Sequence, residues 1–188
     1  MDAFSYLSVL LSIILGLAIT QVLQGIRGLL LARGRVRLYA PTLIWCALIL
    51  IFATQSWWAS FGLAGVRDWT FAGFGTLLLQ TTLLYMLAAL VLPDFPGGEP
   101  VDLKEHYFRE ARPFYIVTVA MLASSLLKDK AIGGHFPGGE NLAFHFIFAG
   151  FGTVMAISRN TRVHLALSIL TALLVATYIA LLFSVLGR

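Results

Sequence analysis

The stretch FSYLSVLLSIILGLAITQVLQGI, residues 4–26, decides the fold class of this protein. Its 23 residues include no Asp, Glu, Lys or Arg. At 1.5 Å per residue, a helix of that length can cross a hydrocarbon core of about 30 Å. No basic segment precedes the apolar run, and no small-residue cleavage site follows a short apolar core. We therefore expect a retained membrane span and not a removable signal peptide.

Five further apolar stretches follow, at residues 41–63, 70–92, 113–128, 140–157 and 163–186. Only 12% of the residues are charged and the mean hydropathy is +0.88, whereas soluble domains carry about 25% charged residues. The pattern predicts an all-α, polytopic transmembrane helical bundle of about six spans. The loops are too short for a separate soluble domain, so residues 1–188 form a single transmembrane domain. The fourth and fifth stretches are short, and a re-entrant hairpin is an alternative to two full crossings.

The basic residues predict the orientation. One set of loops carries nine of the 13 Lys and Arg residues: Arg27, Arg33, Arg35, Arg37, Lys104, Arg109, Arg112, Arg159 and Arg162. The opposite side carries Arg67, Lys128, Lys130 and Arg188. Because cytoplasmic loops are enriched in Lys and Arg, both termini are predicted to lie outside. Trp57, Trp58 and Trp69 would then mark the outer interface, and Tyr39 and Trp45 the inner one.

The longest polar segment predicts a short amphipathic cytoplasmic helix near residues 102–112. Asp102 and Glu105 have the spacing of a capping box. Leu103, Tyr107 and Ala111 share one helical face, and Glu105 with Arg109 has the spacing of an i,i+4 ion pair. Pro113 suits the first turn of a new helix, so the fourth span is expected to begin there.

Small and polar residues recur at every fourth position of two spans. The first-span stripe consists of Ser8, Ser12, Gly16, Thr20 and Gln24. It is either a packing seam or the polar lining of a solute path. The sixth-span seam consists of Ser168, Ala172, Ala176, Ala180 and Ser184, and it suits close helix contact. We expect these two surfaces to pack against each other, within one chain or between copies.

Gln55 and Gln80 lie inside the second and third spans. Lipid offers no hydrogen-bond partner, so Gln80, and Gln24 of the first-span stripe, must be buried in protein or wetted by a cavity. Gln24, Gln55 and Gln80 are therefore candidates for a polar lining, or for structural links between helices.

No catalytic, metal or cofactor site is expected. Cys46 is the single cysteine, the four histidines are predicted to lie apart, and the spans contain no carboxylate for a proton relay. A loop enzyme would depend on Asp94, Asp102, Glu105, His106 and Glu110, but a charged loop is usually a solvated face. The string FAGFGT occurs at 71–76 and 148–153, and we interpret it as small residues in helices and not as an ion filter.

Several segments resemble an uncharacterised bacterial family of multi-pass inner-membrane proteins of unknown function. They are YLSVL at 6–10, SIILGL at 12–17, RGRVR at 33–37, WW at 57–58, and VDL at 101–103 with YF at 107–108. The resemblance implies a location in the bacterial inner membrane and says nothing about mechanism.

The sequence favours a protein that acts by assembly or binding within the membrane, as a homo-oligomer or as an accessory subunit of a membrane complex. No nucleic-acid partner is expected, because the net positive charge comes from loop arginines. The alternative is a channel or facilitative transporter for an ion or small solute, lined by the first-span stripe. A wetted cavity that reaches Gln24 or Gln80 would favour transport, and a dry bundle with a flat apolar flank would favour a subunit role.

Overall fold

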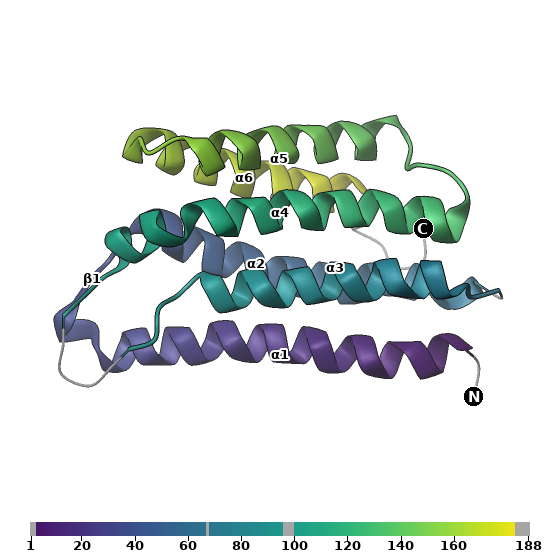
Figure 1. The fold of residues 1–188 in the computed structure, drawn as a ribbon, viewed down its shortest axis with the longest axis horizontal. Helices are drawn as coiled ribbons and strands as arrows, with labels where there is room; N and C mark the ends of the chain where they lie inside the picture. The colour runs from purple at the N-terminus through teal and green to yellow at the C-terminus, as the bar shows by residue number, and fades with distance from the viewer. Residues whose placement is uncertain (1–2, 67, 96–99, 183–188) are drawn as a thin grey trace.

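The computed structural model describes residues 3–66, 68–95 and 100–182, which form an all-α bundle of six long helices (Figure 1). The helices are α1 (Ala3–Leu31), α2 (Ala40–Ser60), α3 (Phe71–Leu90), α4 (Leu103–Gly133), α5 (Gly139–Ile157) and α6 (Thr161–Leu182). Two 3-10 helices, η1 (Arg33–Arg35) and η2 (Phe61–Gly65), and two short strands, β1 (Val36–Arg37) and β2 (Val101–Asp102), lie in the connections.

Five helices are long and apolar enough to cross a membrane: α1, α2 together with η2, α3, α5 and α6. At most 33% of the residues in any of their apolar windows are buried inside the bundle, so most of that apolar surface faces outward. A surface of this kind is expected of a membrane protein, since lipid and not water covers it. The predicted all-α membrane bundle is therefore confirmed.

Helix α4 differs from the prediction. A single helix of 31 residues replaces the short amphipathic helix and the separate fourth span, and Pro113 lies inside it. The proline removes one helical hydrogen bond, but Phe114 and Tyr115 directly after it are buried in the core, and this packing keeps the helix continuous. The predicted start is correct, because the Asp102 side chain accepts hydrogen bonds from the backbone N–H groups of Lys104 and Glu105.

The two polar ends of α4 explain why it is not among the five apolar helices. Its uncharged segment, residues 113–127, is about 22 Å long at 1.5 Å per residue. The helix nevertheless runs the length of the bundle between α3 and α5 (Figure 1). Helix α5 also extends along the bundle, over 19 residues, so the re-entrant hairpin is not the arrangement seen.

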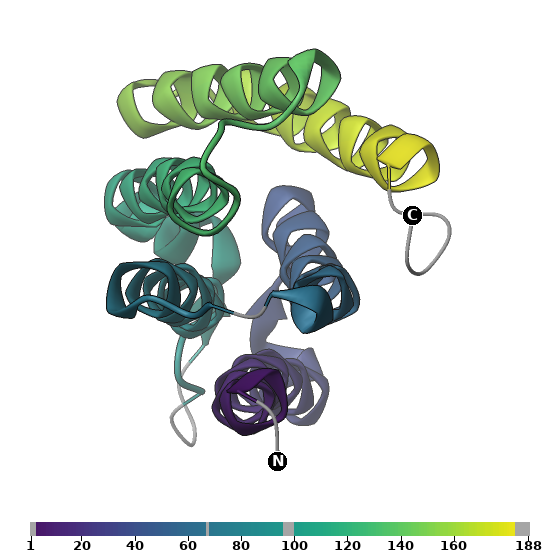
Figure 2. The same cartoon turned by 90° about the vertical axis from the view of Figure 1, so that its right-hand side faces the viewer.

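The packing order separates the first and last helices. Helix α1 packs on α2 and α3, whereas α6 packs on α2 and α5. An end-on view places α1 and α6 on opposite sides of the bundle (Figure 2). The expected contact between them within one chain is therefore wrong. Helix α1 uses another face for packing, on which Leu11, Leu15, Ala18 and Val22 are buried.

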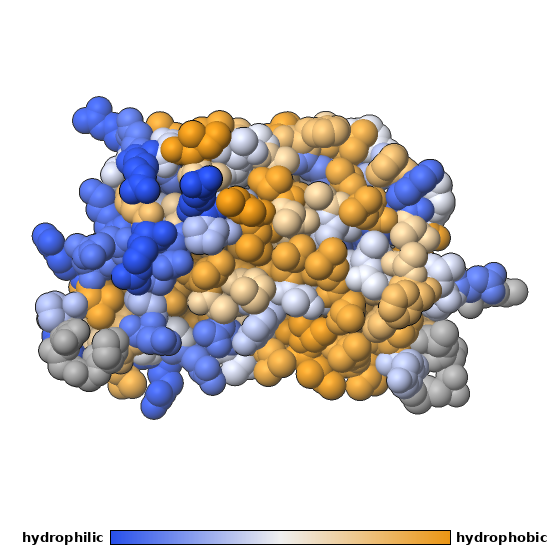
Figure 3. Space-filling view, viewed as in Figure 1, coloured by the Kyte–Doolittle hydropathy of each residue, from blue (hydrophilic) through white to orange (hydrophobic). Residues whose placement is uncertain are grey.

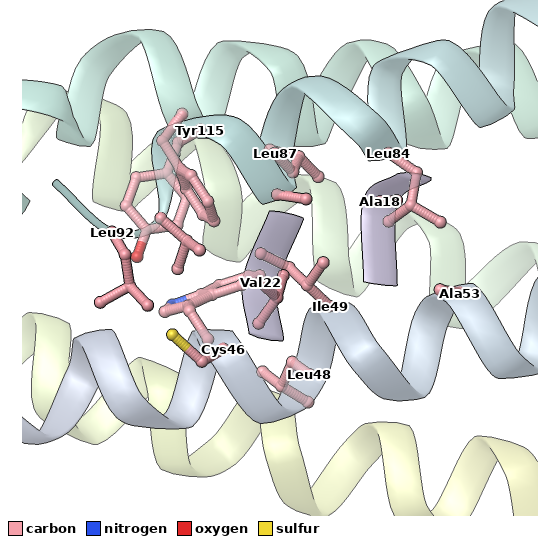
Figure 4. Packing of buried hydrophobic residues seen from close by; sticks show 14 of the residues in the cluster. Ala18, Val22, Cys46, Leu48, Ile49, Ala53, Leu84, Leu87, Leu92 and Tyr115 are labelled. Carbon is pink, nitrogen blue, oxygen red and sulfur yellow. The ribbon is translucent and has the colours of Figure 1, made fainter. Parts of the chain in front are cut away.

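The core lies where α1, α2 and α3 meet α4. Val22, Ile49 and Leu87 are fully buried, and Figure 4 shows them converging from three helices. Two glycines of α1, Gly25 and Gly28, allow the residues that follow α3 to approach α1 closely. A Cβ on Gly25 would lie 2.7 Å from Leu92 Cδ1, and one on Gly28 would lie 2.5 Å from Phe95 Cδ2.

The nine basic residues that were predicted to share one side lie at one end of the bundle, here called the basic end. The most hydrophilic surface gathers there, beside an apolar belt over the middle of the helices (Figure 3). Strands β1 and β2 pair in parallel at this end, and Arg37 forms an ion pair with Asp102 at 3.5 Å. Helix α1 begins and α6 ends at the opposite end (Figure 1). Arg67 and Arg188 lie outside the described residues.

The predicted aromatic belt is wrong at the basic end. Tyr39 and Trp45 are buried, with Trp45 only 2% exposed, because both pack against aromatic side chains of α4. Trp57 and Trp58 near the opposite end are exposed, as an interfacial position requires.

Candidate functional site

A cavity lies inside the bundle, and α2, α3, α4, α5 and α6 all contribute to its wall. Figure 2 shows these five helices arranged in a ring, with α1 outside it against α2 and α3. The space open to the centres of water molecules is about 80 Å³, enough for several waters or a small ligand. Its lining residues are Trp45, Phe52, Gln55, Ser56, Gln80, Thr118, Met121, Leu122, Ser125, His145, Phe148, Gly152, Met155, Thr171, Val175, Tyr178 and Ile179.

The cavity is elongated along the helices. On α2 its wall runs from Trp45 to Ser56, which is roughly 16 Å at 1.5 Å per residue. Most of its wall is apolar, and no Asp, Glu, Lys, Arg or Cys is among the lining residues that the structure describes. A charged ligand would therefore find no counter-ion there.

The Gln80 amide is the least satisfied polar group in this wall. Its Oε1 atom is buried and has no hydrogen-bond partner within the described part of the chain. A buried acceptor left unpaired costs about 1–3 kcal/mol. Gln80 also lines the cavity, so a ligand bound there would lie next to this amide.

His145 offers a second acceptor in the same wall. Its Nδ1 lies 2.8 Å from the backbone oxygen of Asn141. A carbonyl oxygen only accepts, so Nδ1 carries the proton and Nε2 of the neutral ring is an acceptor. Tyr178 fixes the same turn by donating to Asn141 Oδ1 at 3.2 Å.

Gly152 sets the distance between two walls of the cavity. A Cβ at this position would lie 3.1 Å from Val119 Cγ2 and 3.9 Å from the backbone oxygen of Tyr115. The glycine therefore lets α5 approach α4 closely. The sequence drew attention to Gly152 only as part of the FAGFGT string and not to Val119, because close approach depends on which helices become neighbours.

A buried polar network borders the cavity at Trp45. His164 Nε2 lies 3.0 Å from the backbone oxygen of Ser158, so it must donate, and Nδ1 must accept. Tyr107 then donates to Nδ1 at 2.8 Å and accepts from the hydroxyl of Tyr115. The chain of donors runs from Tyr115 through Tyr107 and His164 to Ser158.

Trp45 extends this polar region to α6. Its Nε1 donates to the hydroxyl of Ser168 at 3.2 Å, and both side chains are buried. Trp45 is thus a shared element of the network and of the cavity wall. The network links α2, α4 and α6. It could not be found from the sequence, because Trp45 and Ser168 are 123 residues apart.

The structure divides the predicted site residues. Gln55 and Gln80 meet in the cavity. In the first-span stripe Ser12, Gly16, Thr20 and Gln24 are exposed and Ser8 is partly exposed. The stripe faces away from the cavity, so it does not line a path inside a single chain. Gln24 is not buried in protein as one expectation had it: it is exposed and lines a separate hollow with Gly25 and Leu92.

The sixth-span seam is also divided. Ser168 is buried, Ala172 is half-buried, and Ala176 and Ala180 are exposed. Ser184 lies outside the described residues. Only the end of this seam nearest the basic end is used in packing within the chain, through the hydrogen bond from Trp45.

Both FAGFGT strings are helical, so their backbone carbonyls belong to helices and do not form an ion filter. They also differ in their surroundings. In the first copy the third residue, Gly73, packs near Ile132. In the second copy the fifth residue, Gly152, packs near Val119, so the two packed glycines are not equivalent. The two strings are therefore separate local solutions, as interpreted from the sequence.

His106, Arg109 and Glu110 at the basic end interact with one another. His106 Nε2 donates to the backbone oxygen of Leu90 at 3.1 Å, and Nδ1 accepts from Arg109 at 3.1 Å. Burial lowers the pKa of His106, and the positive charge of Arg109 lowers it further. Arg109 pairs with Glu110 at 3.1 Å and not with Glu105 as predicted.

No family model, no curated protein and no solved structure matches the chain.

Proposed function

We propose that this protein resides in the bacterial inner membrane and binds a small, uncharged molecule without catalysing a reaction. The molecule would bind in the cavity that helices α2, α3, α4, α5 and α6 enclose. The observation that supports this most directly is the buried, unpaired Gln80 oxygen in an otherwise mainly apolar wall. A binding pocket commonly combines apolar walls with a few polar groups that fix the ligand.

The chemistry of the wall defines the class of ligand. The Gln80 oxygen and the His145 Nε2 are both acceptors, so the ligand should carry a hydrogen-bond donor such as a hydroxyl. Phe52, Met121 and Phe148 favour an apolar body. Burying an ion without a counter-charge is far more costly than burying a hydroxyl that is paired.

The test compares neutral medium-chain alcohols with alkanes of equal length, by the thermal unfolding of the purified protein in mild detergent. Alcohols should raise the unfolding temperature, because a ligand at one hundred times its Kd stabilises by about 2.7 kcal/mol. Alkanes should have a smaller effect, because they cannot donate to the two acceptors.

Gln80→Leu sharpens the test. It removes the unpaired oxygen at similar size, so the ligand-free protein should become more stable by about 1–3 kcal/mol and lose its response to alcohols. Gln24→Leu is the matched control, since Gln24 is an exposed glutamine outside the cavity. Equal responses to alkanes and alcohols, or an unchanged alcohol response in Gln80→Leu, would contradict the proposal.

A second candidate function is assembly through α1. Its stripe leaves Gly16 exposed with no atom within 4 Å of an added Cβ, so another helix can approach there. Without a hydrophobic force between helices in lipid, close contact of small residues supplies the attraction. A Gly16→Cys chain in which Cys46 is replaced by Ala should form disulfide-linked dimers in native membranes, and a Gly150→Cys chain should not. A solute path lined by the stripe would require the same assembly, because the stripe faces out of the single chain.

The basic end is proposed to be cytoplasmic, which places both chain ends outside. The proposal rests on the gathering of nine basic residues at that end.

A further inference from the structure

A second pocket lies at the basic end, where α4 passes the end of α5. Unlike the cavity, it is lined by charged residues. Its open volume is about 300 Å³. The wall combines two arginines and a serine with apolar residues: Phe108, Ala111, Arg112, Ala156, Ile157, Ser158 and Arg159. Arg112 belongs to α4, and Arg159 lies in the connection from α5 to α6.

Within the described residues neither of the two arginines forms an ion pair, whereas Arg37 and Arg109 each pair with a carboxylate. No acidic side chain is among the residues that line this pocket. Two cations on one wall repel each other, and an anion between them would replace that repulsion with attraction. The planar guanidinium matches phosphate oxygens in a bidentate geometry.

The rest of the wall indicates an amphiphile. Ile157, the last residue of α5, is 80% exposed, and Phe108 is half-buried beside it in the pocket wall. In water this exposed side chain would be unfavourable, but at the edge of a bilayer it can contact acyl chains. The pocket therefore offers charge and apolar surface together, at the level where the charged end meets the apolar belt.

We infer that this pocket binds an anionic phospholipid, with the phosphate between Arg112 and Arg159 and the acyl chains along Ile157. Basic pockets between helices at a membrane surface are suited to such headgroups. The inference does not depend on the function proposed for the cavity.

The test uses native mass spectrometry of the full chain in mild non-ionic detergent. The probes are phosphatidylglycerol, phosphatidylcholine with the same acyl chains, and inorganic phosphate. Phosphatidylglycerol should bind at least about tenfold more tightly than either of the others. Equal binding of phosphatidylcholine would exclude headgroup recognition, and equal binding of phosphate would make this a site for a free anion.

Two double variants separate a site from general charge. R112Q/R159Q should lower the affinity for phosphatidylglycerol at least about tenfold, whereas R33Q/K104Q, which removes the same charge from the same end, should change it less than about twofold. Equal losses would reduce the effect to diffuse electrostatics and overturn the inference. All four side chains are exposed, so unfolding temperatures without lipid should be unchanged. R112K/R159K should lose part of the affinity, because lysine cannot bind phosphate in the bidentate manner, and full affinity would contradict that geometry.

Discussion

Tyr107→Phe should destabilise the bundle several times more than Tyr115→Phe, although each substitution removes a single hydroxyl. The reason is the direction of the hydrogen bonds. The Tyr107 hydroxyl donates to His164 and accepts from Tyr115, whereas the Tyr115 hydroxyl stands at the start of the donor chain. His164 and Tyr115 are both fully buried.

The magnitudes follow from what each variant leaves unpaired. Tyr107→Phe leaves the His164 Nδ1 acceptor and the Tyr115 donor without their partner, at about 1–3 kcal/mol for each buried group, so a total of about 2–6 kcal/mol is expected. Tyr115→Phe leaves Tyr107 still donating to His164 and costs the bond between the two hydroxyls, about 1 kcal/mol. Trp45 and Ser168 also interact with the Tyr115 hydroxyl, but they keep the hydrogen bond to each other. Together the two changes should cost less than their sum, because the stranded Tyr115 hydroxyl is then absent.

The assay is equilibrium unfolding in mixed micelles, with increasing denaturing detergent and helix content followed by circular dichroism. Wild type, both single variants and the double variant complete a cycle. If Tyr115→Phe costs as much as Tyr107→Phe, or if the two costs are additive, the directed hydrogen-bond chain is wrong.

Three other predictions test the packing, the titration and the orientation. Gly28→Ala should destabilise the protein by about 1–3 kcal/mol, because the added methyl overlaps the Phe95 ring. Gly16→Ala meets no neighbour and should stabilise α1 by up to about 1 kcal/mol. The same unfolding assay compares the two variants. Burial lowers the pKa of His106, so as the pH falls the unfolded chain binds the proton before the folded chain does. The stability that His106 contributes, measured against His106→Gln, should therefore be constant above about pH 6.5 and decrease below it. Unfolding curves of both proteins across that range measure the difference. Gly34→Cys should react with a membrane-impermeant thiol reagent only from the cytoplasm and Gly138→Cys only from outside, and labelling of both from one side would refute the proposed orientation.

The helical membrane class was determined locally by the sequence. Apolar runs without charges, such as residues 4–26, can satisfy their backbone groups in lipid only as helices, whatever their neighbours are. The gathering of basic residues at one end also followed from span order alone. The start of α4 could be predicted because Asp102 caps neighbouring residues along the chain.

What failed depended on which helices meet. Pro113 indicated a boundary, but burial of Phe114 and Tyr115 against the other helices keeps α4 continuous. Trp45 looked interfacial by its place near a helix start, but aromatic side chains of α4 surround it. A stripe at i+4 spacing identifies a face and does not identify its partner, so the predicted contact of α1 with α6 was wrong.

The candidate site shows the same division. Membrane depth alone showed that Gln80 needs a partner, since lipid provides no hydrogen bonds. The meeting of Gln55 and Gln80 with His145 and Tyr178 in one cavity required five helices to pack in a particular order. Hydropathy is a property of each segment, whereas a cavity is the space left when segments far apart in the chain pack together, and only the tertiary structure decides its shape and its walls.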